Sequence, residues 1–262
     1  MGFGGAALGN LYAPVDDATA EATVAQALAV GVGHFDTAPY YGYGLSEQRL
    51  GRALAGVERS AFTISSKVGR VLVPRAGGAR SDQGFVDAHA FDPVFDYSYE
   101  GVMRSFESSL DRLAVDRIDV LLLHDIGALT HRRAHPERFR VAMSDGLRAM
   151  VQLRDAGAIG AIGLGVNECA VCIEALERAD LDCILLAGRY TLLEQTALDE
   201  LLPLCDARGV SLVVGGPFNS GVLVEPDLRH YDYAEPPAEI IERVERLRGG
   251  CAAHDVPLAA AA

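Results

Sequence analysis

The sequence predicts an α/β fold of parallel strands, most simply a (β/α)8 barrel. Short apolar runs rich in β-branched residues alternate with longer segments of helical period along the 262 residues. The apolar runs show no polar alternation, as expected of strands that are covered on both faces. Strand–helix–strand repeats of this kind require parallel strands joined by right-handed crossovers. No shift in composition marks a boundary, so we expect one domain over residues 1–262.

The strand candidates are short and are bounded by glycine or polar residues. They cover residues 2–5, 34–37, 62–67, 119–124, 159–166, 183–187 and 211–215. The segments between them carry apolar residues at steps of three and four, which predicts helices with one apolar face. Asp16 or Asp17 is suited to cap the first helix, and Ser98 the third. Two longer connections, 70–97 and 125–136, follow carboxyl ends of strands, where α/β folds place their active sites.

These seven strand candidates are one fewer than a closed (β/α)8 barrel requires. Residues 258–262 have the composition of a helix that begins rather than ends. We therefore expect about seven βα units in this chain, with the eighth unit missing and the barrel incomplete at its C-terminal end. An open, doubly wound sheet is the alternative.

The charge and cysteine content narrow the possible partners and location. The chain has 23 basic and 36 acidic residues, a net charge of −13, which disfavours binding to nucleic acid. No apolar run is long enough to cross a membrane, and no basic residue precedes Arg49, as a signal peptide would require. Five cysteines, an odd number in a chain that needs no disulfides, predict reduced thiols and a cytoplasmic location. The oligomeric state stays open.

Two short motifs have a structural and a functional interpretation, and we favour the structural one for both. Cys169-x-x-Cys172 is either a redox or half-metal site or two small residues on a helix, and no second such pair exists. We predict no metal site. Gly2-x-Gly4-x-x-Ala7 fits a dinucleotide fingerprint, but no strand precedes it and no acidic residue follows about 20 positions later. A Rossmann domain is therefore disfavoured.

A stronger signal lies where three successive strands end. Asp36, Lys67 and His124 close the second, third and fourth strand candidates, and Tyr41 follows Asp36 in a turn rich in proline and glycine. In a barrel these four groups face the same C-terminal mouth. Singly, each has a structural explanation: an ion pair, a satisfied histidine or a packed aromatic ring. Their occurrence together at consecutive strand ends favours a catalytic role.

The four groups suit a reaction at a carbonyl oxygen. A free phenol has a pKa of about 10 and is a poor acid at neutral pH. We expect the Lys67 ammonium to lower the pKa of Tyr41, and Asp36 to balance the charge of Lys67. The His124 imidazole can orient the oxygen by a hydrogen bond. This set would protonate a carbonyl oxygen as a hydride reaches its carbon, or perform the reverse reaction.

The motifs around these residues resemble those of the aldo-keto reductase family. They are FDTAPYYGYGLSE at 35–47, SSK at 65–67 and LLLH at 121–124. The resemblance covers essentially the whole chain. It implies a barrel that binds NAD(P)H without a Rossmann fold, and the tetrad Asp36, Tyr41, Lys67 and His124 with Tyr41 as general acid and base. Segments 2–12, 124–127 and 186–193 further resemble the branch with D-threo-aldose 1-dehydrogenase (L-fucose dehydrogenase) and pyridoxal 4-dehydrogenase, whose members mostly oxidise with NAD.

The same resemblance implies a set of cofactor contacts. Asn167 would bind the nicotinamide carboxamide, and Tyr190 would stack on its ring. Ala187 stands where most of the family has glutamine. The loop beside the pyrophosphate would contribute Pro217, Phe218, Asn219, Gly221 and Leu223. NAD is favoured over NADP.

We therefore expect an NAD(P)-dependent oxidoreductase that transfers a hydride between nicotinamide and an aldose hemiacetal or aldehyde. The substrate would be a small carbonyl compound or sugar, with residues 70–97 shaping its pocket. A non-catalytic barrel that senses the cofactor, or an inactive fragment, is the alternative. A lyase or isomerase would need a metal set or a Schiff base on Lys67, which is the only lysine.

Overall fold

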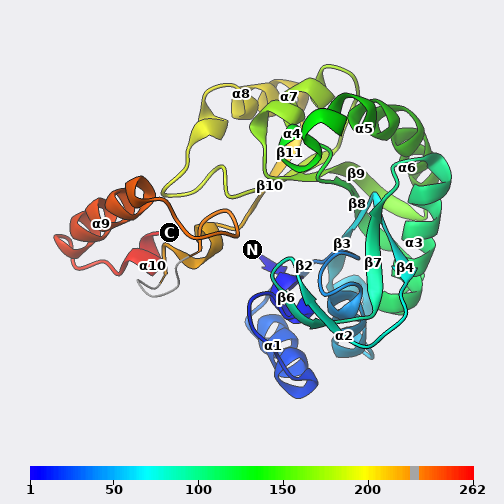
Figure 1. Ribbon diagram of the computed structural model, residues 1–262, viewed down its shortest axis with the longest axis horizontal. Coiled ribbons are helices and arrows are strands. Elements are labelled where there is room, and N and C mark those ends of the chain that lie inside the picture. Colours follow the sequence, from blue (N-terminus) through cyan, green and yellow to red (C-terminus); the bar gives the residue numbers. More distant parts are fainter. Residues whose placement is uncertain (225–229) are drawn as a thin grey trace. The chain divides into compact units, whose positions relative to one another are not determined.

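The computed structural model describes residues 1–224 and 230–262, which fall into two compact units (Figure 1). The first unit is Met1–Leu164 and the second is Gly165–Ala262. Each unit is built from parallel strands joined by helices, and each is described separately below.

The sheet of the first unit is parallel and follows the order β1-β2-β3-β8-β9. Its strands are β1 (Gly2–Gly4), β2 (His34–Asp36), β3 (Thr63–Val68), β8 (Ile118–His124) and β9 (Ile159–Val166), the last of which continues into the second unit. Phe35 pairs with Phe3 on one side and Ile64 on the other, and Asp36 pairs with Ser65. All five strands lie within a residue or two of their predicted positions, because strands covered on both faces appear as unbroken apolar runs.

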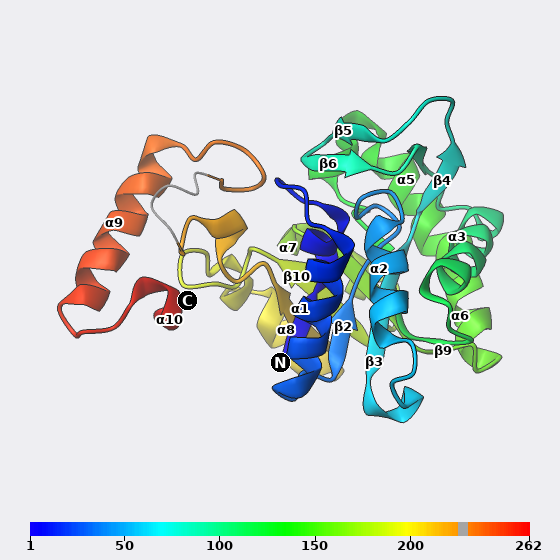
Figure 2. The same cartoon turned by 90° about the horizontal axis from the view of Figure 1, so that it is seen from below.

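Helices connect these strands, and two of them begin at the capping residues that the sequence predicts. They are α1 (Asp17–Ala29), α2 (Leu45–Leu54), α3 (Tyr99–Leu113), α4 (Ala128–His131), α5 (His135–Val141) and α6 (Leu147–Asp155). Asp16 caps α1 by accepting a hydrogen bond from the Thr19 amide, and Ser98 caps α3 in the same way from Gly101. Helices α1 and α2 lie side by side (Figure 2).

Residues 70–97 form two small antiparallel sheets, where the sequence predicts only a long connection. Strand β4 (Arg70–Pro74) pairs with β7 (Phe91–Phe95), and β5 (Arg80–Asp82) pairs with β6 (Phe85–Ala88). Gln83 and Gly84 both have positive φ angles, as a two-residue hairpin turn requires. Phe85, directly after this turn, is buried. The hairpin thus adds a buried aromatic ring that the sequence pattern alone does not reveal.

A buried ion pair fastens α2 to α3 and β3. Glu47 on α2 is fully buried, and its carboxylate accepts hydrogen bonds from Arg112 Nε at 2.6 Å and Ser66 Oγ at 2.8 Å. The two helices lie so close together that a Cβ atom at Gly51 would be only 2.4 Å from the Leu113 carbonyl oxygen. The carboxylate therefore has partners from two other elements, which offsets the loss of its hydration.

The second unit contains the strands β10 (Cys183–Ala187) and β11 (Ser211–Gly215), which pair in parallel with Leu185 opposite Val213. Both match their predicted ranges. Its helices are α7 (Cys169–Leu176), α8 (Leu201–Arg208), α9 (Ala238–Ala252) and α10 (Leu258–Ala261). An apolar cluster joins α9 and α10 to the chain around residues 193 and 222–223; its buried members are Leu193, Val222, Leu223, Ile240, Val244 and Leu258.

Cys169 and Cys172 lie on α7, as the structural interpretation of their spacing predicts. Burial raises the pKa of both thiols, which disfavours thiolate chemistry at this pair. Within 1–224 and 230–262, no group of three or more histidine, cysteine or acidic side chains is arranged to hold a metal ion. No helix in these ranges is long and apolar enough to cross a membrane.

Replacing Glu47 with alanine should destabilise the first unit strongly. The substitution leaves the half-buried Arg112 guanidinium without its carboxylate, and loss of one member of a buried pair costs about 3–5 kcal/mol. Urea denaturation followed by circular dichroism measures the change. Arg52→Ala on the same helix breaks an exposed ion pair with Asp17 and should cost about 1 kcal/mol or less. Equal losses from the two variants would contradict the role assigned to Glu47.

Candidate active site

A buried ion pair joins the ends of β2 and β3. Lys67 Nζ donates hydrogen bonds to Asp36 Oδ2 at 2.7 Å and to the Thr37 carbonyl oxygen at 2.8 Å. Ser65 Oγ donates to the other oxygen of the Asp36 carboxylate at 2.7 Å. Only 1% of the Lys67 surface is exposed and 9% of that of Asp36. Both charges are thus balanced inside the protein rather than by solvent.

Tyr41 lies directly against this ion pair. The ammonium of Lys67 is 4.7 Å from the centroid of the Tyr41 ring, and the His124 ring stands perpendicular to it at 6.0 Å. The turn that carries Tyr41 packs tightly on the chain near β1, where a Cβ atom at Gly9 would lie 2.5 Å from the Tyr41 carbonyl carbon. The Tyr41 hydroxyl group makes no hydrogen bond within the described ranges. All four predicted tetrad side chains therefore lie together in the first unit.

The pKa of Tyr41 is raised well above its ordinary value, whereas the sequence predicts that Lys67 lowers it. Burial of the phenol is the largest cause, and the Asp36 and Asp125 carboxylates add to it while Arg70 opposes it. Lys67 lies over the face of the ring, where its charge does not overcome these effects. The phenol consequently keeps its proton at neutral pH.

His124, at the end of β8, is a neutral imidazole. Burial lowers its pKa well below the ordinary value, and the charges of Arg70 and Lys67 lower it further. Its Nδ1 atom is buried and has no hydrogen-bond partner within the described ranges. A neutral ring of this kind carries one N–H donor that can bind an oxygen atom.

Three further side chains border the site and were not singled out from the sequence. Phe85 lies 5.3 Å from the Tyr40 ring and 6.3 Å from the Tyr41 ring, measured between centroids. Arg70 pairs with Asp125, and its guanidinium lies 3.8 Å from the centroid of the Tyr40 ring. The sequence positions of Arg70 and Asp125 could have indicated them: Arg70 follows Lys67 by three residues, and Asp125 directly follows His124.

Two of the predicted cofactor residues meet in the second unit, at a small pocket of about 20 Å³. The pocket is lined by Asn167, Ala187, Gly188, Gly216, Asn219, Ser220, Asp232 and Tyr233. Tyr190, Pro217 and Phe218 do not line it, and Leu223 is fully buried in the apolar cluster around α9. Asn219 donates to the Gly188 carbonyl oxygen at 3.1 Å and accepts from Thr191 Oγ1 at 2.6 Å. Its amide therefore already has protein partners on both atoms.

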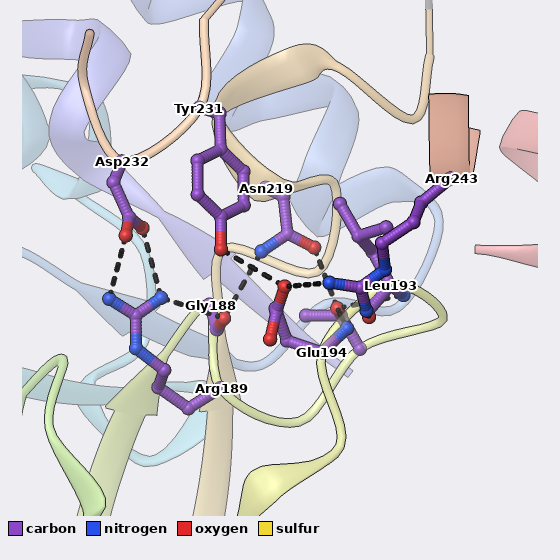
Figure 3. A network of polar contacts seen from close by, with 9 residues as sticks. Gly188, Arg189, Leu193, Glu194, Asn219, Tyr231, Asp232 and Arg243 are labelled. Atoms are coloured by element: carbon purple, nitrogen blue, oxygen red, sulfur yellow. Dashed lines mark hydrogen bonds and ion pairs between the residues drawn. The ribbon is translucent and has the colours of Figure 1, made fainter. Parts of the chain in front are cut away.

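Charged residues extend this arrangement around the loop after β10 (Figure 3). Arg189 donates two hydrogen bonds to the Asp232 carboxylate, at 2.9 and 2.8 Å. The Glu194 carboxylate accepts from Tyr231 at 3.0 Å and from Arg243 of α9 at 3.1 Å. These contacts tie the loop to segments some 40 to 50 residues later in the chain.

Comparison with known proteins gives consistent matches along the whole chain. The model of the Aldo/keto reductase family matches residues 1–262. The chain is 46% identical to a pyridoxal 4-dehydrogenase from Microbacterium luteolum, over all of this chain and 80% of that protein. It is 38% identical to a D-threo-aldose 1-dehydrogenase from a Pseudomonas species, over all of this chain and 79% of that protein.

Solved structures show the same fold. A glycerol dehydrogenase from Gluconobacter oxydans superposes with a TM-score of 0.71 at 22% identity, over 98% of this chain and 75% of that one. An aldo-keto reductase from Bacillus halodurans, in its holo form, gives 0.69 at 27% identity, over 98% and 78%. The fold is therefore a parallel barrel of the (β/α)8 type, as predicted, rather than an open doubly wound sheet. The chain belongs to the aldo/keto reductase family and is an NAD(P)-dependent oxidoreductase.

Proposed function

We propose that this protein is a dehydrogenase of aldoses or aldehydes, with Asp36, Tyr41, Lys67 and His124 as its catalytic residues. The observation that carries the proposal is the Tyr41 phenol, which packs against the Lys67 ammonium and the His124 imidazole and whose hydroxyl group has no hydrogen-bond partner among the described residues. The names of two relatives, a pyridoxal and an aldose dehydrogenase, support the substrate class. A sugar hemiacetal or an aromatic aldehyde is the substrate we expect.

The side chains at the site fit hydride transfer to a nicotinamide. The Tyr41 hydroxyl group makes no hydrogen bond to a described residue, and His124 Nε2 lies 3.5 Å from Asp125 Oδ2, longer than an ordinary hydrogen bond, so both groups can bind the oxygen at which charge develops. The bound cofactor supplies the hydride chemistry. In reduction Tyr41 donates its proton to the substrate oxygen, and in oxidation it takes the hydroxyl proton. His124 orients that oxygen, and Lys67 with Asp36 stabilises the phenolate.

We further propose that NAD is preferred over NADP. We assign the cofactor contacts to Asn167, Tyr190, Pro217, Phe218, Asn219, Gly221 and Leu223. For Asn219 and Leu223 the role would be to position the loop, because one binds its own backbone and the other is buried. Residues 1–262 would form one barrel domain, supported by a single family match over this range. All five cysteines are free thiols, which supports a reducing compartment such as the cytoplasm.

The two other functions weighed from the sequence are less well supported. A Schiff base needs a free amine, but Lys67 is held by the Asp36 carboxylate and a backbone oxygen. The named relatives are enzymes, which disfavours a non-catalytic sensor. An absorbance assay of nicotinamide reduction, with a panel of aldoses and pyridoxal and with either NAD⁺ or NADP⁺, tests the proposed function. Absence of turnover with every combination of substrate and cofactor, in a protein shown to bind the cofactor, would favour a non-catalytic sensor.

Tyr41→Phe should lower kcat by about 100-fold or more, because acid–base catalysis by a side chain contributes roughly that much. Cofactor affinity should change little, since the ring remains. Tyr43→Phe is the matched control: its ring lies in the same turn, but its hydroxyl group faces the Asp82 carbonyl oxygen. Steady-state kinetics and cofactor titration measure both. Comparable kcat values for the two variants would remove Tyr41 from the mechanism.

The oxidation rate should rise with pH, while the reduction rate should not. Because the pKa of Tyr41 is raised, the phenol is protonated throughout the neutral range. Reduction uses this protonated form and should be nearly independent of pH there. Oxidation uses the phenolate, so kcat/KM should rise roughly tenfold per pH unit below the phenol pKa. Parallel pH profiles in the two directions test this, and an oxidation rate that is flat from pH 6 to 9 would contradict it.

Lys67→Met should shift the alkaline rise of oxidation to still higher pH or abolish activity, because the phenolate loses its nearest cation. The variant should also unfold more easily, since Asp36 stays buried without a counter-charge. The double variant Lys67→Met with Asp36→Asn should recover stability but not activity. Denaturation and pH profiles of both variants separate the two effects. Recovery of activity in the double variant would refute the role of the ammonium.

A further inference from the structure

A second charged pair lies beside His124, on side chains that the tetrad does not include. Arg70 begins β4 and is 8% exposed. Its Nη2 donates to Asp125 Oδ2 at 2.5 Å, and its guanidinium lies 3.8 Å and 4.6 Å from the ring centroids of Tyr40 and Phe95. A guanidinium enclosed by two rings and a carboxylate has little freedom to move.

The Asp125 carboxylate touches both Arg70 and His124. The oxygen that binds Arg70 lies 3.5 Å from His124 Nε2. Asp125 has a φ of +51°, a backbone conformation that is unfavourable for most non-glycine residues. At this turn the Tyr97 hydroxyl group lies 2.7 Å from the His124 carbonyl oxygen and 3.2 Å from that of Asp125. The carboxylate is therefore held at one particular nitrogen of the imidazole.

We propose that Arg70 and Asp125 are positioning residues that keep His124 in its neutral form with the proton on Nε2. The proposal rests on the role of His124 in binding the substrate oxygen. Asp125 attracts the proton to Nε2, and Arg70 balances the carboxylate so that the ring does not take up a second proton. Neither residue needs to touch the substrate.

The electrostatics of the site support this division of roles. A carboxylate near one ring nitrogen favours a proton there, but alone it also stabilises the imidazolium. The charged groups facing His124 are Lys67 from β3, Arg70 from β4 and its neighbour Asp125, and the phenols of Tyr40 and Tyr41 stand at its edge. Asp36 balances Lys67 and Arg70 balances Asp125, so no uncompensated carboxylate faces the ring. The buried Nδ1 atom has no acceptor, which also disfavours a proton on that side.

The position of Arg70 depends on the turn that precedes it. Gly69 has a φ of +103°, and a Cβ atom there would lie 2.2 Å from the Tyr97 ring. Only glycine allows the chain to turn so closely against the Tyr97 ring. The hydroxyl group of this ring donates a hydrogen bond to the His124 carbonyl oxygen. The turn at Gly69 thus allows both Lys67 of β3 and Arg70 of β4 to act on His124.

Nitrogen-15 NMR of the histidine rings in the full chain tests the proposal without turnover or cofactor. His124→Asn identifies the His124 signals among those of the seven histidines. We expect the Nε2–H form and a titration midpoint below that of free histidine. Arg70→Met should raise the midpoint by about one unit or more, and Arg70→Lys should keep it low. Asp125→Asn should yield a mixture of the two neutral forms. Arg104→Met, which breaks an exposed pair with Asp96, should change neither property.

The outcomes distinguish positioning from a purely structural role. A proton on Nδ1 in the unsubstituted protein, or an unchanged midpoint in folded Arg70→Met, would overturn the proposal. If Arg70→Met does not fold, Asp125→Asn decides, because one unchanged neutral form in that variant also overturns it. Steady-state kinetics of the same variants test the proposed dehydrogenase activity independently of the NMR result. An inactive protein whose ring behaves as expected would refute the proposed dehydrogenase and leave the positioning pair intact.

Discussion

The arrangement of the site depends on one buried ion pair, between the ammonium of Lys67 and the carboxylate of Asp36. Neither charge is stable in the interior alone, because burial removes its hydration. The sheet register brings them together: Asp36 pairs with Ser65, and Lys67 lies two residues further along β3 on the same face. The hydrogen bonds from Ser65 and to the Thr37 carbonyl oxygen complete the pair. Tyr41 then packs on this ammonium, and His124 packs on the Tyr41 ring.

This constraint also explains why the phenol behaves differently from the expectation based on residue types alone. A nearby cation predicts a lowered pKa, but the site that holds the cation also buries the phenol and contains two carboxylates. Burial outweighs the cation over the ring face. The protein thus holds a protonated phenol beside a neutral imidazole. In the proposed mechanism, reduction would use this protonated phenol, and oxidation would draw on the small fraction of phenolate.

Much of this could be predicted from the sequence, for reasons that are local. Strands such as β8 and β9 appear as unbroken apolar runs, so the strands could be found from the sequence pattern. Asp36, Lys67 and His124 lie at the ends of three strands, so these site residues could be found from their position. The hairpin around Gln83 was missed because its strands are only three and four residues long and lack a continuous apolar run. Arg70 was missed because its partners, Tyr40, Phe95 and Asp125, are distant in sequence and reach it only through tertiary packing.

The cofactor residues show a different limit of sequence reasoning. A motif match assigns Asn219 to ligand binding, and its amide also has the Gly188 carbonyl oxygen and Thr191 Oγ1 as protein partners. Arg189 and Glu194 in the same loop are likewise occupied by Asp232, Tyr231 and Arg243. The same residue type can either shape a loop or contact a ligand. The sequence does not distinguish the two roles, whereas the hydrogen-bond partners in the structure do. In the first unit, by contrast, the Tyr41 hydroxyl group makes no hydrogen bond to any residue that the structure describes. That difference is why the chemistry is assigned from Tyr41 and not from the loop after β10.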